Sequence, residues 1–184
     1  MNASTAQRPA NPREEFLAGL QAGMMGVCWM LAWLGVSGIA QRRGFWSAEN
    51  LLASVFYGEG AIRPGFSSRT VSGAALYLTV YSLLGAGFAV AVRQRLTALG
   101  TVLLGILVAA GWYGLCFRML GRTMMPLVWL LHTESSTVFG HVIFGVWMAR
   151  YRAFLAPSGE AGGACAGPAV ETAEEAATPD SGAG

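Results

Sequence analysis

The stretch TMMPLVWLLHTESSTVFGHVIFGVWMARYR, residues 123 to 152, decides how the fold is read, because it combines membrane-like hydrophobicity with ionisable side chains. It contains both histidines of the chain, His132 and His141, together with Glu134. An ionisable side chain at membrane depth is energetically costly, so it marks a site of function or of helix packing. These three residues are therefore the first candidates for functional importance.

Composition and hydropathy predict an integral membrane protein. Hydrophobic residues make up 54% of the 184 residues and charged residues only 12%, and the mean hydropathy is +0.47. The apolar residues occur in runs of about twenty, which matches the thickness of the hydrocarbon core of a bilayer. We expect an all-α, polytopic membrane protein: a four-helix transmembrane bundle with one or two short interfacial helices.

Four hydrophobic stretches are the expected spans, at about 16–40, 71–92, 97–117 and a last one that begins near 124 or 135 and ends at 151. The first span carries ridges of small residues that allow a second helix to approach closely: Ala18, Gly19, Ala22, Gly23 and Gly26. Gln21 lies beside these ridges, and we expect it to donate an interhelical hydrogen bond. A solvated cavity around Gln21 is the alternative.

The segment 47–57 is too short to span a bilayer and is predicted to be an amphipathic helix in the membrane interface. We expect Leu52 and Val55 to be protected by the membrane, and Glu49, Asn50 and Ser54 to be accessible to water. The polar segment 1–15 and the acidic tail 156–184 lack the apolar residues needed for a core, so both are expected to be disordered.

The position of Glu134 depends on the register of the last span. In a long register one helix runs from about residue 124 to 150, so Glu134 and His141 share a face near the middle of the bilayer and His132 points away from His141. In a short register residues 123–131 lie in the interface and the last span begins near Ser135 or Ser136. Glu134 then sits near the positive end of that helix, where a carboxylate is favoured. The polar run from 132 to 137 is typical of a helix entrance, which favours the short register.

Four interpretations of the polar residues compete. The first is packing, with His141 and Glu134 bonded to a neighbouring helix or to an interfacial arginine such as Arg122. The second is a proton or ion path through Glu134 and His141. The third is haem ligation by His141, and the fourth a metal site formed by His132, Glu134 and His141. Packing is favoured, and we expect neither a cofactor nor a metal.

An enzymatic function is not expected. All twelve basic residues are arginine, so no lysine exists to act as a phosphate-loop, Schiff-base or general-base residue. Cys28, Cys116 and Cys165 are far apart and form no metal-binding or disulfide pattern. The net charge of +2 favours no particular partner, and we expect no binding to nucleic acid.

The sequence therefore predicts a non-enzymatic membrane protein whose partners are the lipid bilayer and other membrane helices. The leading hypothesis is an accessory or assembly subunit of a larger complex, or a homo-oligomer, because the helix faces are rich in glycine. The alternative is a small transporter or channel with Glu134 and His141 in its path. We expect a bacterial inner-membrane location with both termini in the cytoplasm, since no export signal precedes the first helix.

Overall fold

The computed structural model describes residues 11–93 and 95–155, and within them every regular element is a helix. In chain order the elements are α1 (Pro12–Ala40), α2 (Ser47–Tyr57), the 3-10 helix η1 (Gly58–Ala61), α3 (Ser68–Val92), α4 (Ala98–Tyr113), the π-helix η2 (Gly114–Leu120), α5 (Gly121–Met124), α6 (Pro126–Leu131), α7 (Glu134–Met148) and the 3-10 helix η3 (Ala149–Phe154). The predicted all-α class is confirmed for this part of the chain. The expected acidic tail, 156–184, and residues 1–10 lie outside the described residues.

Among the described residues, three helical stretches are long and apolar enough to cross a membrane: Pro12–Ala40, Ser68–Val92 and the continuous run Ala98–Met124. The last of these joins α4, η2 and α5. By contrast, α7 has only 15 residues, which cover roughly 22 Å at about 1.5 Å per residue. The fourth expected span therefore does not reach membrane length as an α-helix on its own.

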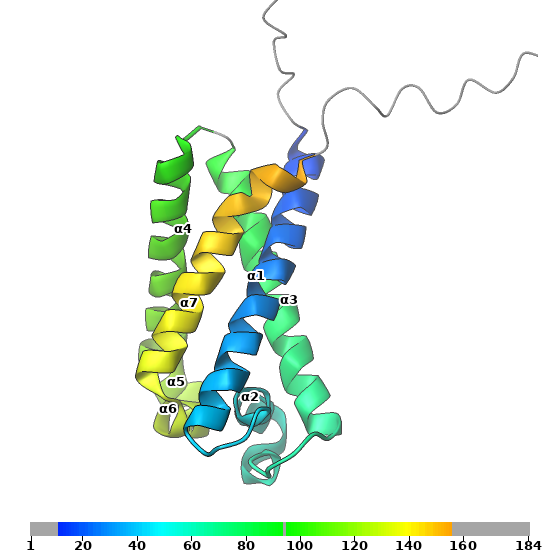
Figure 1. Cartoon of the computed structure of the whole chain (residues 1–184), viewed down its shortest axis with the longest axis vertical. Coiled ribbons are helices and arrows are strands. Elements are labelled where there is room, and N and C mark those ends of the chain that lie inside the picture. Colours follow the sequence, from blue (N-terminus) through cyan, green and yellow to red (C-terminus); the bar gives the residue numbers. More distant parts are fainter. Residues whose placement is uncertain (1–10, 94, 156–184) are drawn as a thin grey trace, which may run out of the picture. The chain divides into compact units, whose positions relative to one another are not determined.

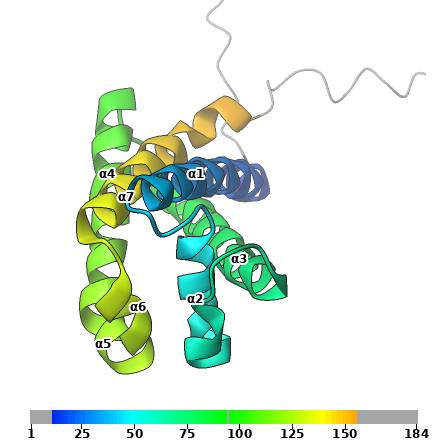
Figure 2. The same cartoon turned by 60° about the horizontal axis from the view of Figure 1, so that its bottom comes forward.

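The four long helices α1, α3, α4 and α7 run roughly along one axis and alternate in direction (Figure 1). α1 packs mainly against α3 and α7, and α7 in turn packs against α4. The short helices α2, α5 and α6 lie at the end of the bundle where α1 finishes, which we call the α2 end (Figures 1 and 2). The opposite end, the Pro12 end, carries the start of α1, the α3–α4 connection and η3.

α1 begins at Pro12, four residues earlier than predicted. The side-chain oxygen of Asn11 accepts a hydrogen bond from the backbone N–H of Arg13, and the backbone N–H of Asn11 donates to the Glu14 carboxylate at 3.0 Å. This reciprocal capping and the proline at the first helical position both favour a helix start at this point. The predicted disorder of the segment 1–15 is thus corrected for its last four residues, which are helical.

The small residues of α1 pack against helices of the same chain. A Cβ atom on Gly19 would lie 2.6 Å from the carbonyl oxygen of Gly85 in α3, and one on Gly26 would lie 3.0 Å from the ring of Phe144 in α7. Both neighbours approach α1 more closely than a larger side chain would allow. The ridges were predicted to allow close packing of a second helix. They pack closely against two helices of this chain, α3 and α7.

α2 lies against α3 with its polar face inward, which corrects the predicted orientation. Glu49 and Asn50 are only 2% and 4% exposed, whereas Val55 is 41% exposed. The Asn50 carboxamide accepts a hydrogen bond from the Thr70 hydroxyl at 2.6 Å and donates one to the carbonyl of Gly65 at 3.0 Å. The hydrogen-bond partners of Asn50 therefore come from the loop after α2 and the start of α3, and not from water as predicted.

α6 and α7 are separate helices, so the single helix of the long register is not formed, and the last helix begins one residue before the start expected for the short register. α6 ends at Leu131, and Thr133 precedes the first turn of α7, which contains Glu134. Pro126 opens α6, and Met125 before it is non-helical, with φ −136° and ψ 58°. A proline disfavours helical backbone in the residue before it, so the chain changes direction at this point.

Candidate functional site

The π-helix η2 positions the polar residues of the α2 end. π-helical segments are rare in proteins, and those that occur are often located at functional sites. The wider turn of η2 changes the face on which the following residues lie, compared with an uninterrupted α-helix. Arg118 in η2 reaches the first turn of α7, and Arg122 in α5 reaches α6.

Gly121 allows α6 to pack closely on α5. A Cβ atom at this position would lie 3.2 Å from the Cβ of Trp129 and 3.2 Å from the carbonyl oxygen of Cys116. This tight approach holds Trp129 and the end of α6 beside the two arginine-bearing helices. A pocket of about 330 Å³ lies between them, which we call the α6 pocket. It is lined by Tyr113, Phe117, Arg118, Arg122, Trp129, His132 and Glu134.

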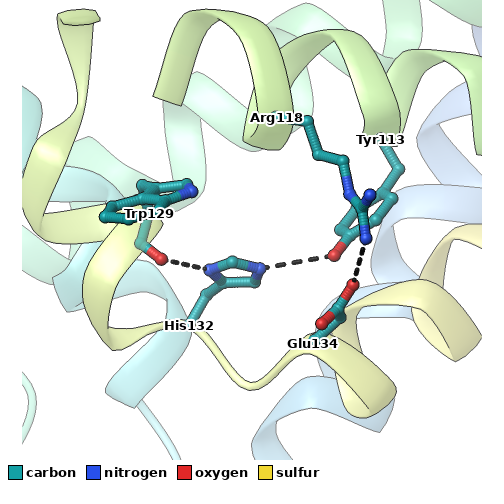
Figure 3. A network of polar contacts seen from close by, with 5 residues as sticks. All are labelled: Tyr113, Arg118, Trp129, His132 and Glu134. Carbon is teal, nitrogen blue, oxygen red and sulfur yellow. Dashed lines mark hydrogen bonds and ion pairs between the residues drawn. The ribbon is translucent and has the colours of Figure 1, made fainter. Parts of the chain in front are cut away.

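His132 lies in the α6 pocket between a backbone carbonyl and a tyrosine hydroxyl (Figure 3). Its Nδ1–H donates to the carbonyl oxygens of Trp129 at 2.9 Å and of Val128 at 3.0 Å. Because these carbonyls can only accept, Nε2 is the acceptor nitrogen, and it receives a long hydrogen bond from the Tyr113 hydroxyl at 3.4 Å. The ring is half-buried.

Glu134 forms an ion pair with Arg118 across the same pocket, with 3.0 Å between the carboxylate oxygen and the guanidinium nitrogen (Figure 3). Arg122 was the predicted example of an arginine partner for Glu134. It instead stacks on the ring of Trp129, with its guanidinium 5.1 Å from the ring centre. The side chains of the ion pair are 74% and 63% exposed. An exposed pair of this kind contributes about 0–1 kcal/mol to stability.

His141 repeats this hydrogen-bonding scheme inside the bundle. Its Nδ1–H donates to the carbonyl of Thr137 at 2.7 Å, and its Nε2 accepts from the hydroxyl of Tyr81 in α3 at 2.7 Å. The side chain is 2% exposed. Both ring nitrogens therefore have partners, and one of these partners lies on a neighbouring helix.

The rings of Tyr113 and Phe117 lie between the two histidines. The Phe117 ring centre is 4.7 Å from that of His132 and 5.9 Å from that of His141, and Tyr113 likewise contacts both imidazoles. These are ring contacts, so the hydrogen-bonded groups around His132 and around His141 form two separate sets. In one continuous helix, His132 and His141 would point in opposite directions. Because the chain breaks between α6 and α7, both rings can contact the same two aromatic side chains.

Gln21 lies on the outer surface of α1 and has no hydrogen-bond partner among the described residues. The neighbouring positions Ala22 and Gly23 are buried against other helices. The expected interhelical hydrogen bond of Gln21 is therefore not made within the described part of the chain.

Within residues 11–93 and 95–155, no group of three or more His, Cys, Asp or Glu side chains is arranged to hold a metal ion. Glu134 is engaged by Arg118, and aromatic rings separate His132 from His141. Both ring nitrogens of His141, the expected alternative haem ligand, have hydrogen-bond partners in this arrangement.

The tyrosines that hydrogen-bond to the two histidines, and the arginine that pairs with Glu134, were not predicted from the sequence. A weak signal existed for Tyr81, because a tyrosine inside an apolar span needs a partner for its hydroxyl group. No comparable signal distinguished Arg118 from Arg122, since the π-helical register that separates them is not visible in the sequence.

Comparison of the chain with protein-family models, with curated proteins and with solved structures found no match. The class of protein is therefore assigned from the helices of this chain alone. In the part of the chain that the structure describes, three helices have the length and hydropathy of membrane spans, which indicates a multi-pass helical membrane protein.

Proposed function

We propose that this chain is a four-span integral membrane protein that acts through association of membrane helices, as a homo-oligomer, and not through catalysis. The observation that carries the proposal is the exposed position of Gln21 on an otherwise apolar face of α1. A polar side chain facing hydrocarbon is costly unless it finds a partner, and polar residues of this kind associate transmembrane helices.

Four outward residues of α1 share one stripe with the spacing i, i+4, i+7 and i+11: Leu17, Gln21, Met24 and Cys28. Leu17 is 57% exposed and Met24 is 48% exposed. Gln21 lies roughly 14 Å along the axis from the start of α1, at about 1.5 Å per residue, which is within the hydrocarbon. Its carboxamide has both donors and acceptors, so two copies related by a twofold axis can pair with each other.

Cysteine cross-linking in membranes tests the homo-oligomer. With the native cysteines replaced by serine, Met24→Cys should form a cross-linked dimer, and adding Gln21→Leu should weaken the dimer by about 1 kcal/mol. The matched control is Ala110→Cys on the exposed face of α4, which should not cross-link. Cross-linking at Ala110→Cys alone, or stoichiometric co-purification of a different protein with a monomer of this chain, would contradict the proposal.

The fourth span is supported by the continuous helical run that α7 and η3 form from Glu134 to Phe154. At about 1.5 Å per α-helical residue and 2.0 Å per 3-10 residue, the contour of the run measures roughly 34 Å, compared with a hydrocarbon thickness of about 30 Å. Reporter fusions after Arg95 and after Leu155 should then report the same side of the membrane, which we propose is the cytoplasm of a bacterium. Opposite sides for the two fusions would mean three spans.

A small transporter or channel is the second candidate, with Glu134 and His141 in the conduction path. The observation that favours it is proximity, because Tyr113 and Phe117, which line the α6 pocket, also contact the buried His141. The two separate sets of hydrogen bonds and the full pairing of His141 favour packing instead.

Substitution of His141 distinguishes the two candidates. If His141 serves packing, His141→Gln should reduce assembly of the protein, and flux in liposomes should show no pH-dependent component that depends on this residue. If it carries protons, His141→Gln should leave assembly intact and abolish a pH-dependent flux. We expect the first result.

A further inference from the structure

The α6 pocket has an excess of positive charge. It contains two guanidinium groups, Arg118 and Arg122, and one carboxylate, Glu134. Glu134 pairs with Arg118, while Arg122 forms no ion pair with any described residue and only stacks on Trp129. One positive charge of the pocket is therefore left without a counter-charge from the described residues.

The walls of the pocket are aromatic, and its surroundings are apolar. Phe117 is buried and the rings of Trp129 and Tyr113 complete the lining. Several large apolar residues on the adjoining helices are strongly exposed: Met119, Met124 and Leu130, at 68%, 70% and 68%. A ligand that combines an anionic group with hydrocarbon would match both the charge and the surroundings.

If α4 begins at one boundary of the hydrocarbon, the pocket lies at the depth of the lipid headgroups on the other side. Arg118 follows the first residue of α4, Ala98, by about 30 Å at roughly 1.5 Å per residue, and this equals the thickness of the hydrocarbon core. Trp129 beside it is a residue type enriched at the membrane interface. A basic pocket between helices at this depth is suited to the phosphate of a lipid headgroup.

We propose that the α6 pocket binds the phosphate diester of an anionic phospholipid, with Arg122 as its main contact and Arg118 shared between the lipid and Glu134. A volume of about 330 Å³ accommodates a headgroup of this size. Arginine suits this role because its planar fork can donate two hydrogen bonds to one phosphate group. Glu134 competes with the lipid for Arg118, so it sets an upper limit on the affinity.

Lipid retention by the full-length protein tests this site. The protein is reconstituted in vesicles of phosphatidylcholine with an increasing fraction of phosphatidylglycerol, extracted in mild detergent, and examined by native mass spectrometry. Phosphatidylglycerol should be retained in preference to phosphatidylcholine. Arg122→Gln should weaken this retention about tenfold, as expected for loss of a charge-assisted hydrogen bond.

Two variants keep the test sharp. Arg42→Gln removes the same charge from an exposed arginine at the α2 end that does not line the pocket, and it should leave retention unchanged. Glu134→Gln frees Arg118 and should raise retention by about two- to threefold. An increase is a result that a misfolded protein would not give.

Three outcomes would overturn the proposal. They are equal loss of lipid with Arg42→Gln and Arg122→Gln, a decrease with Glu134→Gln, and displacement of phosphatidylglycerol by an excess of inorganic phosphate. The last of these would assign the pocket to free phosphate. The readout does not depend on self-association, because the pocket lies at the α2 end and Gln21 lies in the half of α1 next to the Pro12 end.

Discussion

The two histidine–tyrosine pairs of this chain have the same hydrogen-bonding scheme in different surroundings. In each pair Nδ1–H donates to the carbonyl of the residue four positions earlier, and Nε2 accepts from a tyrosine on another element. The His141–Tyr81 distance is 2.7 Å, and the His132–Tyr113 distance is 3.4 Å. The first pair is buried inside the bundle, whereas the second borders the α6 pocket.

This difference indicates that enclosure, and not the choice of residues, decides what a polar group contributes. A buried hydrogen bond is costly to lose because its partner is left without water, while a group beside a pocket can exchange its partner for solvent or a ligand. His141 thus links α7 to α3 through a buried hydrogen bond, whereas His132 borders a pocket.

The largest effect that follows from this comparison is expected at Glu49, which is buried like His141 but has an unpaired carboxylate oxygen. Burial raises the pKa of Glu49 above its ordinary value of 4.5, because the charged form loses its hydration. A raised pKa in the folded state means that the stabilising contribution is complete below pH 4.5 and is lost as the pH rises through the folded-state pKa. Glu49→Gln should remove this loss and raise the thermal stability at neutral pH.

Thermal unfolding in detergent, measured below and above pH 4.5, checks the prediction for Glu49. The matched control is Glu134→Gln, since Glu134 is exposed and already paired with Arg118. A wild-type protein whose unfolding temperature has the same pH dependence as that of Glu49→Gln would contradict the burial argument.

The second effect concerns the enclosed histidine. In a double-mutant cycle, Tyr81→Phe and His141→Leu should show a coupling free energy of about 0.6–1.7 kcal/mol, the range found for hydrogen bonds between membrane helices. Reversible unfolding in mixed micelles provides the measurement. Independent, additive losses would mean that the short distance between the two side chains does not reflect a stabilising bond.

The smallest effect is expected at the pocket. The corresponding cycle with Tyr113→Phe and His132→Leu should give a coupling of about 0.5 kcal/mol or less, because the bond is long and solvent can replace it. The same unfolding assay applies. A coupling as large as that of the Tyr81–His141 pair would remove the distinction between the two regions.

The all-α class and the break before the last helix could be predicted from the sequence because they depend on local signals. Long apolar runs end at arginines, and the polar run from His132 to Thr137 indicates a helix entrance. The start of α1 was predicted too late, because the polar residues of a capping box were interpreted as disorder.

The orientation of α2 and the partners of the site residues could not be predicted in this way. Periodicity shows that Glu49 and Asn50 differ in position from Val55, but it does not show whether a polar face meets water or the rest of the protein. The partners of His141 and Glu134 are Tyr81 and Arg118, and the first pair is 60 residues apart in the sequence. Such pairings depend on packing and on the π-helical register of η2.

The close packing of α1 also has a consequence for biosynthesis. Gly26 in α1 is covered by Phe144 and Trp147 of α7, which are synthesised roughly 120 residues later. At about 5–20 residues per second, that interval lasts roughly 6–24 s. During this time the glycine-rich side of α1 facing α7 stays open in the membrane to any other small-residue helix. Correct assembly of the chain thus depends on α1 remaining unpartnered on this side until its own last helix arrives.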